Sequence, residues 1–134
     1  MRYYIAYKFL DSEKGSLKSV LTLISSAIEE TGNKTFIFFR DAQQWGKIQI
    51  PANQVIINAF EELKKCDGFF AFVESDEKSE GLLLEAGYAK ALDKRIVLAI
   101  KKGINLRFLR AIANEVIEFD NLDELKEKIK ETLY

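Results

Sequence analysis

The sequence predicts an α/β protein built on a parallel β-sheet with helices on both of its faces. Short segments of strand character alternate with segments whose apolar residues recur at helical spacing, along the whole chain of 134 residues. The run Gly68–Val73 is apolar throughout, as expected of a strand that is covered on both faces. Regular alternation of strands and helices favours a parallel sheet between two helical layers.

The first two strands are expected before residue 40. Aromatic and β-branched residues predict a strand at Tyr3–Tyr7 and another at Thr35–Phe39. Between them, apolar residues recur at helical spacing over Leu17–Ile28, and Gly32 is expected to end that helix. The segment Arg40–Gly46 is expected to be a polar loop.

The middle of the chain carries a helix, a buried strand and a second helix. Pro51 suits the first turn of a helix whose apolar face runs from Val55 to Leu63. The strand Gly68–Val73 follows, and a charged loop then leads into a helix predicted over Glu80–Leu92.

The last third of the chain repeats the alternation. Arg95–Ile100 is expected to be the fourth strand and Leu106–Ala113 a short helix. Glu115–Phe119 is expected to be the fifth strand, and Leu122–Leu133 a closing helix. With no repeat, linker or low-complexity tract, residues 1–134 are expected to form one domain.

Five strands in this pattern favour a flavodoxin-like or Rossmann-like three-layer sandwich with strand order 2-1-3-4-5. In such a sheet, ligands bind beyond the carboxyl ends of the strands, at the switch point between strands 1 and 3. The loops after Tyr7, Phe39, Val73 and Ile100 are therefore expected to form the site.

Composition excludes several partners and locations. The 20 basic and 21 acidic residues give a net charge of −1, so no electrostatic footprint for a nucleic acid polymer is present. The single cysteine, Cys66, suits a reducing compartment. Neither a signal peptide nor an apolar stretch near the roughly 20 residues of a membrane span is apparent. A cytoplasmic protein without membrane contact is expected.

The sequence contains no histidine. This absence excludes Ser-His-Asp and Cys-His triads, histidine general bases and most zinc sites. Acid-base or nucleophilic chemistry would have to use the remaining side chains, of which carboxylates are the most abundant. We expect neither a metal ion nor another cofactor.

Glu85 is the carboxylate that the sequence singles out. No basic residue lies within four positions on either side, and its helical neighbours are small or apolar, among them Gly81, Leu82 and Ala89. A carboxylate in such surroundings has a raised pKa or a function, so Glu85 is a candidate nucleophile or general acid-base. The alternative is a structural carboxylate that pairs with a distant basic residue or points into solvent.

The segment Ser79–Ala89, with sequence SEGLLLEAGYA, resembles the signature of the nucleoside 2-deoxyribosyltransferase-like family, which includes 2′-deoxynucleoside 5′-phosphate N-hydrolases. The resemblance implies that Glu85 attacks the anomeric carbon of a nucleoside or nucleotide to form a glycosyl-enzyme. It also implies that Gly81 belongs to the substrate site and that Ser79 holds a 5′-phosphate. It implies no cofactor, and an assembly of two or more copies.

By eye, residues 54–100 align with that family, with two departures. Leu83 stands where the family commonly has glycine. Ala59 stands where it has a second carboxylate, and Asn58 beside it is a candidate substrate contact.

Four further residues near the expected ligand end are candidate substrate contacts. Tyr7 and Lys8 end the first strand, and Lys8 could meet a phosphate, although exposed lysines are common. Asp41 could replace the missing acid, or it could form a loop ion pair or an Asx-type turn. Trp45, among polar neighbours, could stack on a nucleobase, or it could pack on its own loop or on another subunit.

Two functions are therefore expected, and a third is more distant. The first is cleavage or transfer at the N-glycosidic bond of a (deoxy)nucleoside or its 5′-monophosphate through Glu85. The second, motivated by Ala59 and Leu83, is a module of the same fold that binds a nucleotide without cleaving it. Toll/interleukin-receptor-like domains also combine such a sheet with a glutamate, but no specific motif indicates them here.

Overall fold

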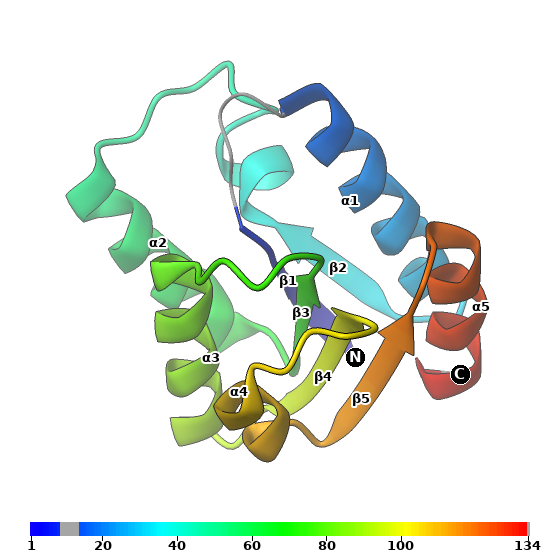
Figure 1. The fold of residues 1–134 in the computed structure, drawn as a ribbon. Coiled ribbons are helices and arrows are strands. Elements are labelled where there is room, and N and C mark those ends of the chain that lie inside the picture. Colours follow the sequence, from blue (N-terminus) through cyan, green and yellow to red (C-terminus); the bar gives the residue numbers. More distant parts are fainter. Residues whose placement is uncertain (9–13, 134) are drawn as a thin grey trace.

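The computed structural model describes residues 1–8 and 14–133 and shows a five-stranded parallel sheet. The strand order is β2-β1-β3-β4-β5, so the predicted flavodoxin-like order 2-1-3-4-5 is confirmed (Figure 1). In chain order, the elements are β1 (Arg2–Ala6), α1 (Lys14–Glu29), β2 (Lys34–Ile37), the π-helix η2 (Phe38–Ala42), α2 (Ala52–Lys65), β3 (Gly68–Val73), α3 (Glu80–Ala91), β4 (Arg95–Lys101), α4 (Arg107–Ile112), β5 (Glu115–Phe119) and α5 (Leu122–Leu133).

Helices cover both faces of the sheet and create two apolar cores. Helices α1 and α5 pack on one face, and α2, α3 and α4 pack on the other (Figure 1). Successive residues of β1 enter opposite cores, with Tyr3 in the α1–α5 core and Tyr4 in the α2–α3–α4 core. Strand β3 is buried at all six positions, in agreement with its apolar sequence.

The carboxyl end of strand β2 differs from the prediction. The expected strand Thr35–Phe39 ends at Ile37, and the chain then forms η2 where a strand end and a polar loop were expected. Side-chain hydrogen bonds account for the difference, since Asp41 accepts from the Ile37 N–H at 2.9 Å and Arg40 donates to the Thr35 carbonyl at 3.1 Å. These hydrogen bonds hold η2 against the end of β2, the strand that precedes it.

Strand β1 begins and ends one residue earlier than expected. Its pairing with β3 ends at Ala6, so Tyr7 lies just beyond the strand. The Tyr7 hydroxyl accepts a hydrogen bond from the Phe39 N–H at 2.9 Å and ties the end of β1 to η2. The other predicted elements agree with the structure to within a few residues at their ends.

Strands β1 and β3 are adjacent at the centre of the sheet, although α1, β2, η2 and α2 separate them in the chain. Their connections leave in opposite directions, to β2 on one side and to β4 on the other, which makes this the topological switch point. Within the described residues, no helix is both long and apolar enough to cross a membrane.

Candidate active site

Glu85 lies on α3 and accepts its hydrogen bond from β1, an interior strand of the sheet. The Tyr4 hydroxyl, from β1, donates to Glu85 Oε2. Tyr4 is 1% exposed and packs between Phe36 and Phe69 with ring centroids 5.5 and 6.0 Å away. A phenol in such a core needs a polar partner, and Glu85 supplies it.

Burial makes Glu85 a weak acid. Desolvation raises its pKa from the ordinary 4.5 to about 7, and the Tyr4 hydrogen bond lowers it by a smaller amount. Burial also raises the pKa of Tyr4 above that of an ordinary phenol, and the charge of Glu85 adds to this. Near neutral pH, therefore, Tyr4 is a protonated donor, and the carboxyl group of Glu85 is present both as the neutral acid and as the carboxylate.

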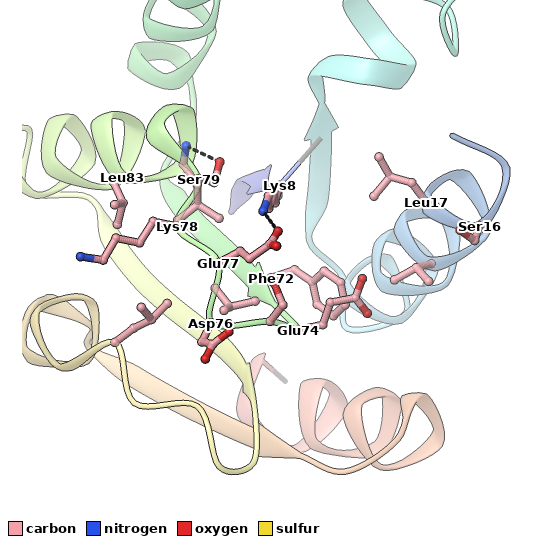
Figure 2. Close-up of a pocket in the computed structure, with 15 residues that line it drawn as sticks. Lys8, Ser16, Leu17, Phe72, Glu74, Asp76, Glu77, Lys78, Ser79 and Leu83 are labelled. Atoms are coloured by element: carbon pink, nitrogen blue, oxygen red, sulfur yellow. Dashed lines mark hydrogen bonds and ion pairs between the residues drawn. The ribbon is translucent and has the colours of Figure 1, made fainter. Parts of the chain in front are cut away.

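A cavity of about 540 Å³ opens at the carboxyl ends of the strands. Apolar side chains of α1 and α3 and polar side chains of the β3–α3 loop surround it (Figure 2). Its lining includes Ser79 and Leu82 but not Glu85, which follows Leu82 by one helical turn. The lining residues are Lys8, Ser16, Leu17, Val20, Phe72, Val73, Glu74, Ser75, Asp76, Glu77, Lys78, Ser79, Leu82, Leu83 and Leu106.

Ser79 and Gly81 form the start of α3. Ser79 is the N-cap, and its Oγ accepts a hydrogen bond from the Leu82 N–H at 3.3 Å. Gly81 is exposed, and a Cβ added there would meet nothing within 4 Å. No packing constraint of the fold therefore requires glycine here, and Gly81 is not among the residues that line the cavity.

The structure places Tyr7 and Lys8 differently, although both follow β1. Tyr7 is partly buried and bonded to η2, and burial raises the pKa of its phenol. Lys8 lines the cavity, where its ammonium forms an ion pair with Glu77 (Figure 2).

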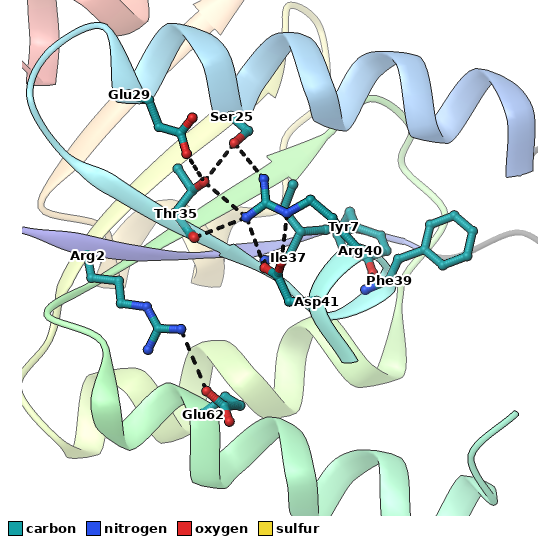
Figure 3. Close-up of polar contacts among 10 residues, drawn as sticks. All are labelled: Arg2, Tyr7, Ser25, Glu29, Thr35, Ile37, Phe39, Arg40, Asp41 and Glu62. Atoms are coloured by element: carbon teal, nitrogen blue, oxygen red, sulfur yellow. Dashed lines mark hydrogen bonds and ion pairs between the residues drawn. The ribbon is translucent and has the colours of Figure 1, made fainter. Parts of the chain in front are cut away.

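The Asp41 carboxylate takes part in a local network of hydrogen bonds and an ion pair (Figure 3). It pairs with Arg40 Nε at 2.9 Å and accepts from the Ile37 N–H. Burial alone would raise the pKa of Asp41, but these two bonds outweigh it and lower the pKa. The structure thus shows the loop ion pair that the sequence left as an alternative, and a substrate contact by Asp41 stays a prediction.

Trp45 packs on its own loop. Its ring meets Phe39 edge-on with centroids 5.4 Å apart, and the Lys18 ammonium lies 5.2 Å from the ring centroid. The structure thus shows the packing on its own loop that the sequence left as an alternative, and stacking of Trp45 on a nucleobase stays a prediction. The fold supplies Phe39 as a neighbour by turning η2 back toward the sheet.

Helix α2 carries Asn58 and Ala59. Asn58 is partly buried, and its side-chain oxygen accepts from Gln54 Nε2 at 2.8 Å. Ala59 is 2% exposed and belongs to the core beneath α2 and α3. Among the residues that the structure describes, no group of three or more Cys, Asp or Glu is placed to hold a metal ion.

Tyr4 is the site residue that sequence reasoning missed. The sequence placed it in a strand but gave no reason to link it to Glu85, 81 residues later. The signal was a tyrosine in a central strand with both faces covered, because its hydroxyl must find a buried partner.

The structure was compared with known proteins. No protein-family model matches the chain, and no curated protein sequence does. The CMP N-glycosidase BcmB of Clostridium botulinum matches with a TM-score of 0.73 and 23% identity over 100% of both chains. The 2-deoxyribosyltransferase of Bacillus psychrosaccharolyticus matches with a TM-score of 0.70 and 18% identity, over 94% of this chain and 90% of its own. The chain has the fold of these enzymes.

A third match supports the same conclusion. The 2-deoxyribosyltransferase of Leishmania mexicana has a TM-score of 0.58 and 18% identity, over 74% of this chain and 63% of its own. The similarity to nucleoside 2-deoxyribosyltransferase-like proteins, indicated by the segment around Glu85, thus extends to the fold of the whole chain.

Proposed function

We propose that the protein breaks the N-glycosidic bond of a nucleoside or nucleoside 5′-monophosphate, with Glu85 as the nucleophile. The observation that carries the proposal is the Tyr4–Glu85 pair, in which a partly buried carboxylate has a pKa of about 7. Glu85 follows Leu82, which lines the cavity at the switch point, by about one helical turn. The named activities of two proteins with this fold support the same class of reaction.

In the proposed first step, ionised Glu85 attacks the anomeric carbon. The C–O bond to the carboxylate forms as the C–N bond to the base breaks, and the base leaves with the bonding electron pair and takes up a proton from solvent. In the second step, water or another base attacks the same carbon, gives up a proton to solvent and releases the carboxylate. Water gives a hydrolase, and a second base gives a transferase.

Tyr4 acts in this scheme as a positioning residue. Its hydroxyl holds the carboxylate in place and favours the ionised form that attacks. Ser79 stands six residues before Glu85, so the two residues are separated by about 9 Å of helix rise. Because helical side chains lean toward the N-terminus, we expect Glu85 to meet a ligand that extends from the cavity lined by Ser79. One small ligand is then expected to meet both residues.

The other candidate contacts belong to the same proposal. Tyr7, Asp41, Trp45 and Asn58 are proposed as substrate contacts, and the substrate is a small molecule rather than a nucleic acid polymer. A homo-oligomer and a cytoplasmic location are expected as well. Neither a metal ion nor another cofactor enters the proposed reaction.

A second function is favoured by Ala59. The buried methyl group at this position supplies no carboxylate to the base or the sugar, in contrast to the pattern of the resembling family. A protein that binds a nucleotide without cleaving it would need no such group. This alternative predicts ligand binding without product.

Incubation with a panel of ribo- and deoxyribonucleosides and their 5′-monophosphates, with and without a second free base, tests the proposal. Base release or exchange is followed by chromatography. We expect Glu85→Gln to lower the rate by more than about a hundredfold. Glu80→Gln, an exposed carboxylate on the same helix, is the matched control and is expected to retain activity. Full activity in Glu85→Gln contradicts the mechanism, and binding without turnover supports the alternative.

A further inference from the structure

The ion pair between Lys8 and Glu77 bridges the two strands of the switch point. Lys8 follows β1, and Glu77 belongs to the loop between β3 and α3. Since β1 and β3 are neighbours, the pair connects the loops at the place where ligands of this sheet topology bind (Figure 2).

The two partners differ in exposure. The Lys8 side chain is 26% exposed, and that of Glu77 is 70% exposed. The Lys8 side chain is thus largely enclosed by the cavity wall, whereas most of the Glu77 side chain is in contact with solvent. The bond to Lys8 lowers the pKa of Glu77, so its carboxylate is ionised at neutral pH.

The surroundings of Lys8 suit an anionic ligand. Ser79, at the N-terminus of the 12-residue helix α3, lines the same cavity as Lys8. A helix N-terminus favours negative charge, and a lysine ammonium is a strong phosphate partner. In the free protein, the carboxylate of Glu77 supplies that negative charge.

We propose that Glu77 occupies the anion position at Lys8 in the free protein and that the 5′-phosphate of the substrate displaces it. The inference rests on the proposed function and narrows its substrate class to nucleoside 5′-monophosphates. Lys8 provides the preference for a phosphorylated ligand. Glu77 is a specificity-determining residue that competes with the phosphate and weakens its binding.

Displacement of Glu77 is favourable for two physical reasons. An ion pair with a largely exposed partner contributes little, so its loss is easily offset. A phosphate brings more charge and more acceptor oxygens than a carboxylate, so Lys8 gains a stronger partner. An uncharged nucleoside offers no such exchange and is expected to leave the pair intact.

The test measures the affinities of the four common ribonucleosides, the four common deoxyribonucleosides and all of their 5′-monophosphates by calorimetry. The Glu85→Gln variant serves as the background, so that no ligand is consumed. We expect at least one monophosphate to bind, and to bind more tightly than its nucleoside. Adding Glu77→Gln is expected to tighten monophosphate binding about two- to fivefold. Adding Lys8→Met is expected to weaken it about tenfold or more. Nucleoside affinity is expected to stay unchanged in both.

A matched variant and a double variant make the result specific. Asp76→Asn removes the same charge from the same loop and cavity wall, and it is expected to change monophosphate affinity less than Glu77→Gln does, because Lys8 pairs with Glu77. In Lys8→Met, the further change Glu77→Gln is expected to give no gain. Thermal unfolding of each variant checks that the fold is retained.

The outcomes separate this inference from the proposed function. Absence of binding by every monophosphate, unchanged affinity in Lys8→Met, or no gain in Glu77→Gln overturns the role of the pair. Base release from nucleosides that depends on Glu85 but not on Lys8 would leave the proposed function standing while the inference fails. Suppose that binding follows the expected pattern but the wild-type protein releases no base. The role of the Lys8–Glu77 pair would then stand, and the proposed function would fail.

Discussion

At the scale of single residues, two opposing effects set the charge of Glu85. Burial favours the neutral acid and is the larger effect, while the Tyr4 hydrogen bond favours the carboxylate. The balance brings the pKa to about 7. A nucleophile must be ionised, so Tyr4 keeps a buried carboxylate usable near neutral pH.

Tyr4→Phe removes the hydroxyl and is expected to raise the pKa of Glu85 above about 7. Activity that needs the carboxylate falls as the pH drops through this pKa, so the acidic limb of the kcat/KM profile is expected to move to higher pH. A move of one pH unit lowers activity on that limb about tenfold. Rates from about pH 5 to 9 and the carboxyl carbon chemical shift of Glu85 both measure it.

Tyr3→Phe is the control for this prediction. The Tyr3 hydroxyl lies on the other face of β1 and accepts from Arg95 at 3.1 Å, so its removal is expected to leave the limb in place. An unmoved limb in Tyr4→Phe would show that the hydroxyl does not set the charge of Glu85.

At the scale of elements, Arg40 and Asp41 protect the free edge of the sheet. Strand β2 is an edge strand, and its outer backbone groups would otherwise be open to another chain. Arg40 donates to the Thr35 carbonyl and Asp41 accepts from the Ile37 N–H (Figure 3). The side chains of η2 thus supply hydrogen-bond partners to backbone groups of β2. Arg40 also donates to Ser25 on α1 at 3.0 Å and thereby joins the edge to a helix.

Asp41→Ala is expected to destabilise the protein by about 1–3 kcal/mol, because the Ile37 N–H loses its acceptor and Arg40 loses its ion pair. The opened edge is also expected to promote aggregation. Urea unfolding and light scattering measure the two effects.

Asp41→Asn separates the two contributions. Its amide oxygen can still accept from Ile37, so a loss of less than about 1 kcal/mol is expected from the ion pair alone. Equal losses in the two variants would mean that the edge hydrogen bond contributes nothing.

The same element marks the limit of what the sequence could predict. Phe38 and Phe39 continue the aromatic and β-branched run of Thr35–Ile37, so local preference extends the strand through them. Side-chain hydrogen bonds decide otherwise. Asp41 accepts from the Ile37 N–H, and the Phe39 N–H bonds to Tyr7 across 32 positions of sequence. Strand propensity describes neither bond.

At the scale of the whole molecule, the alternation of strands and helices was sufficient to predict the sheet order. It also placed the loops after β1 and β3 together, where the cavity and the Lys8–Glu77 pair lie. The composition around Glu85 predicted an unusual carboxylate from residues near it in sequence. Its partner Tyr4 required the three-dimensional packing of α3 on the sheet, which no local pattern contains.

The partly buried carboxylate of Glu85 also affects the stability of the whole fold. Its pKa is about 7 in the folded state and near the ordinary 4.5 in the unfolded state. Below pH 4.5 the carboxyl group is protonated in both states, so its ionisation does not change the free energy of unfolding. As the pH rises, the unfolded state loses the proton first, so the free energy of unfolding decreases until the pH exceeds about 7. The shift corresponds to a loss of about 3 kcal/mol at most.

Glu85→Gln is therefore expected to be more stable than the wild-type protein above pH 7, by up to about 3 kcal/mol, with the difference vanishing near pH 4. Urea unfolding of both proteins across this range measures the difference. Glu80→Gln, exposed on the same helix, is expected to show no comparable gain. A difference independent of pH would mean that packing, rather than ionisation, distinguishes the two proteins. An ionised carboxylate at this position contributes no stability to the fold, which agrees with the proposed role of Glu85 in attack on an anomeric carbon.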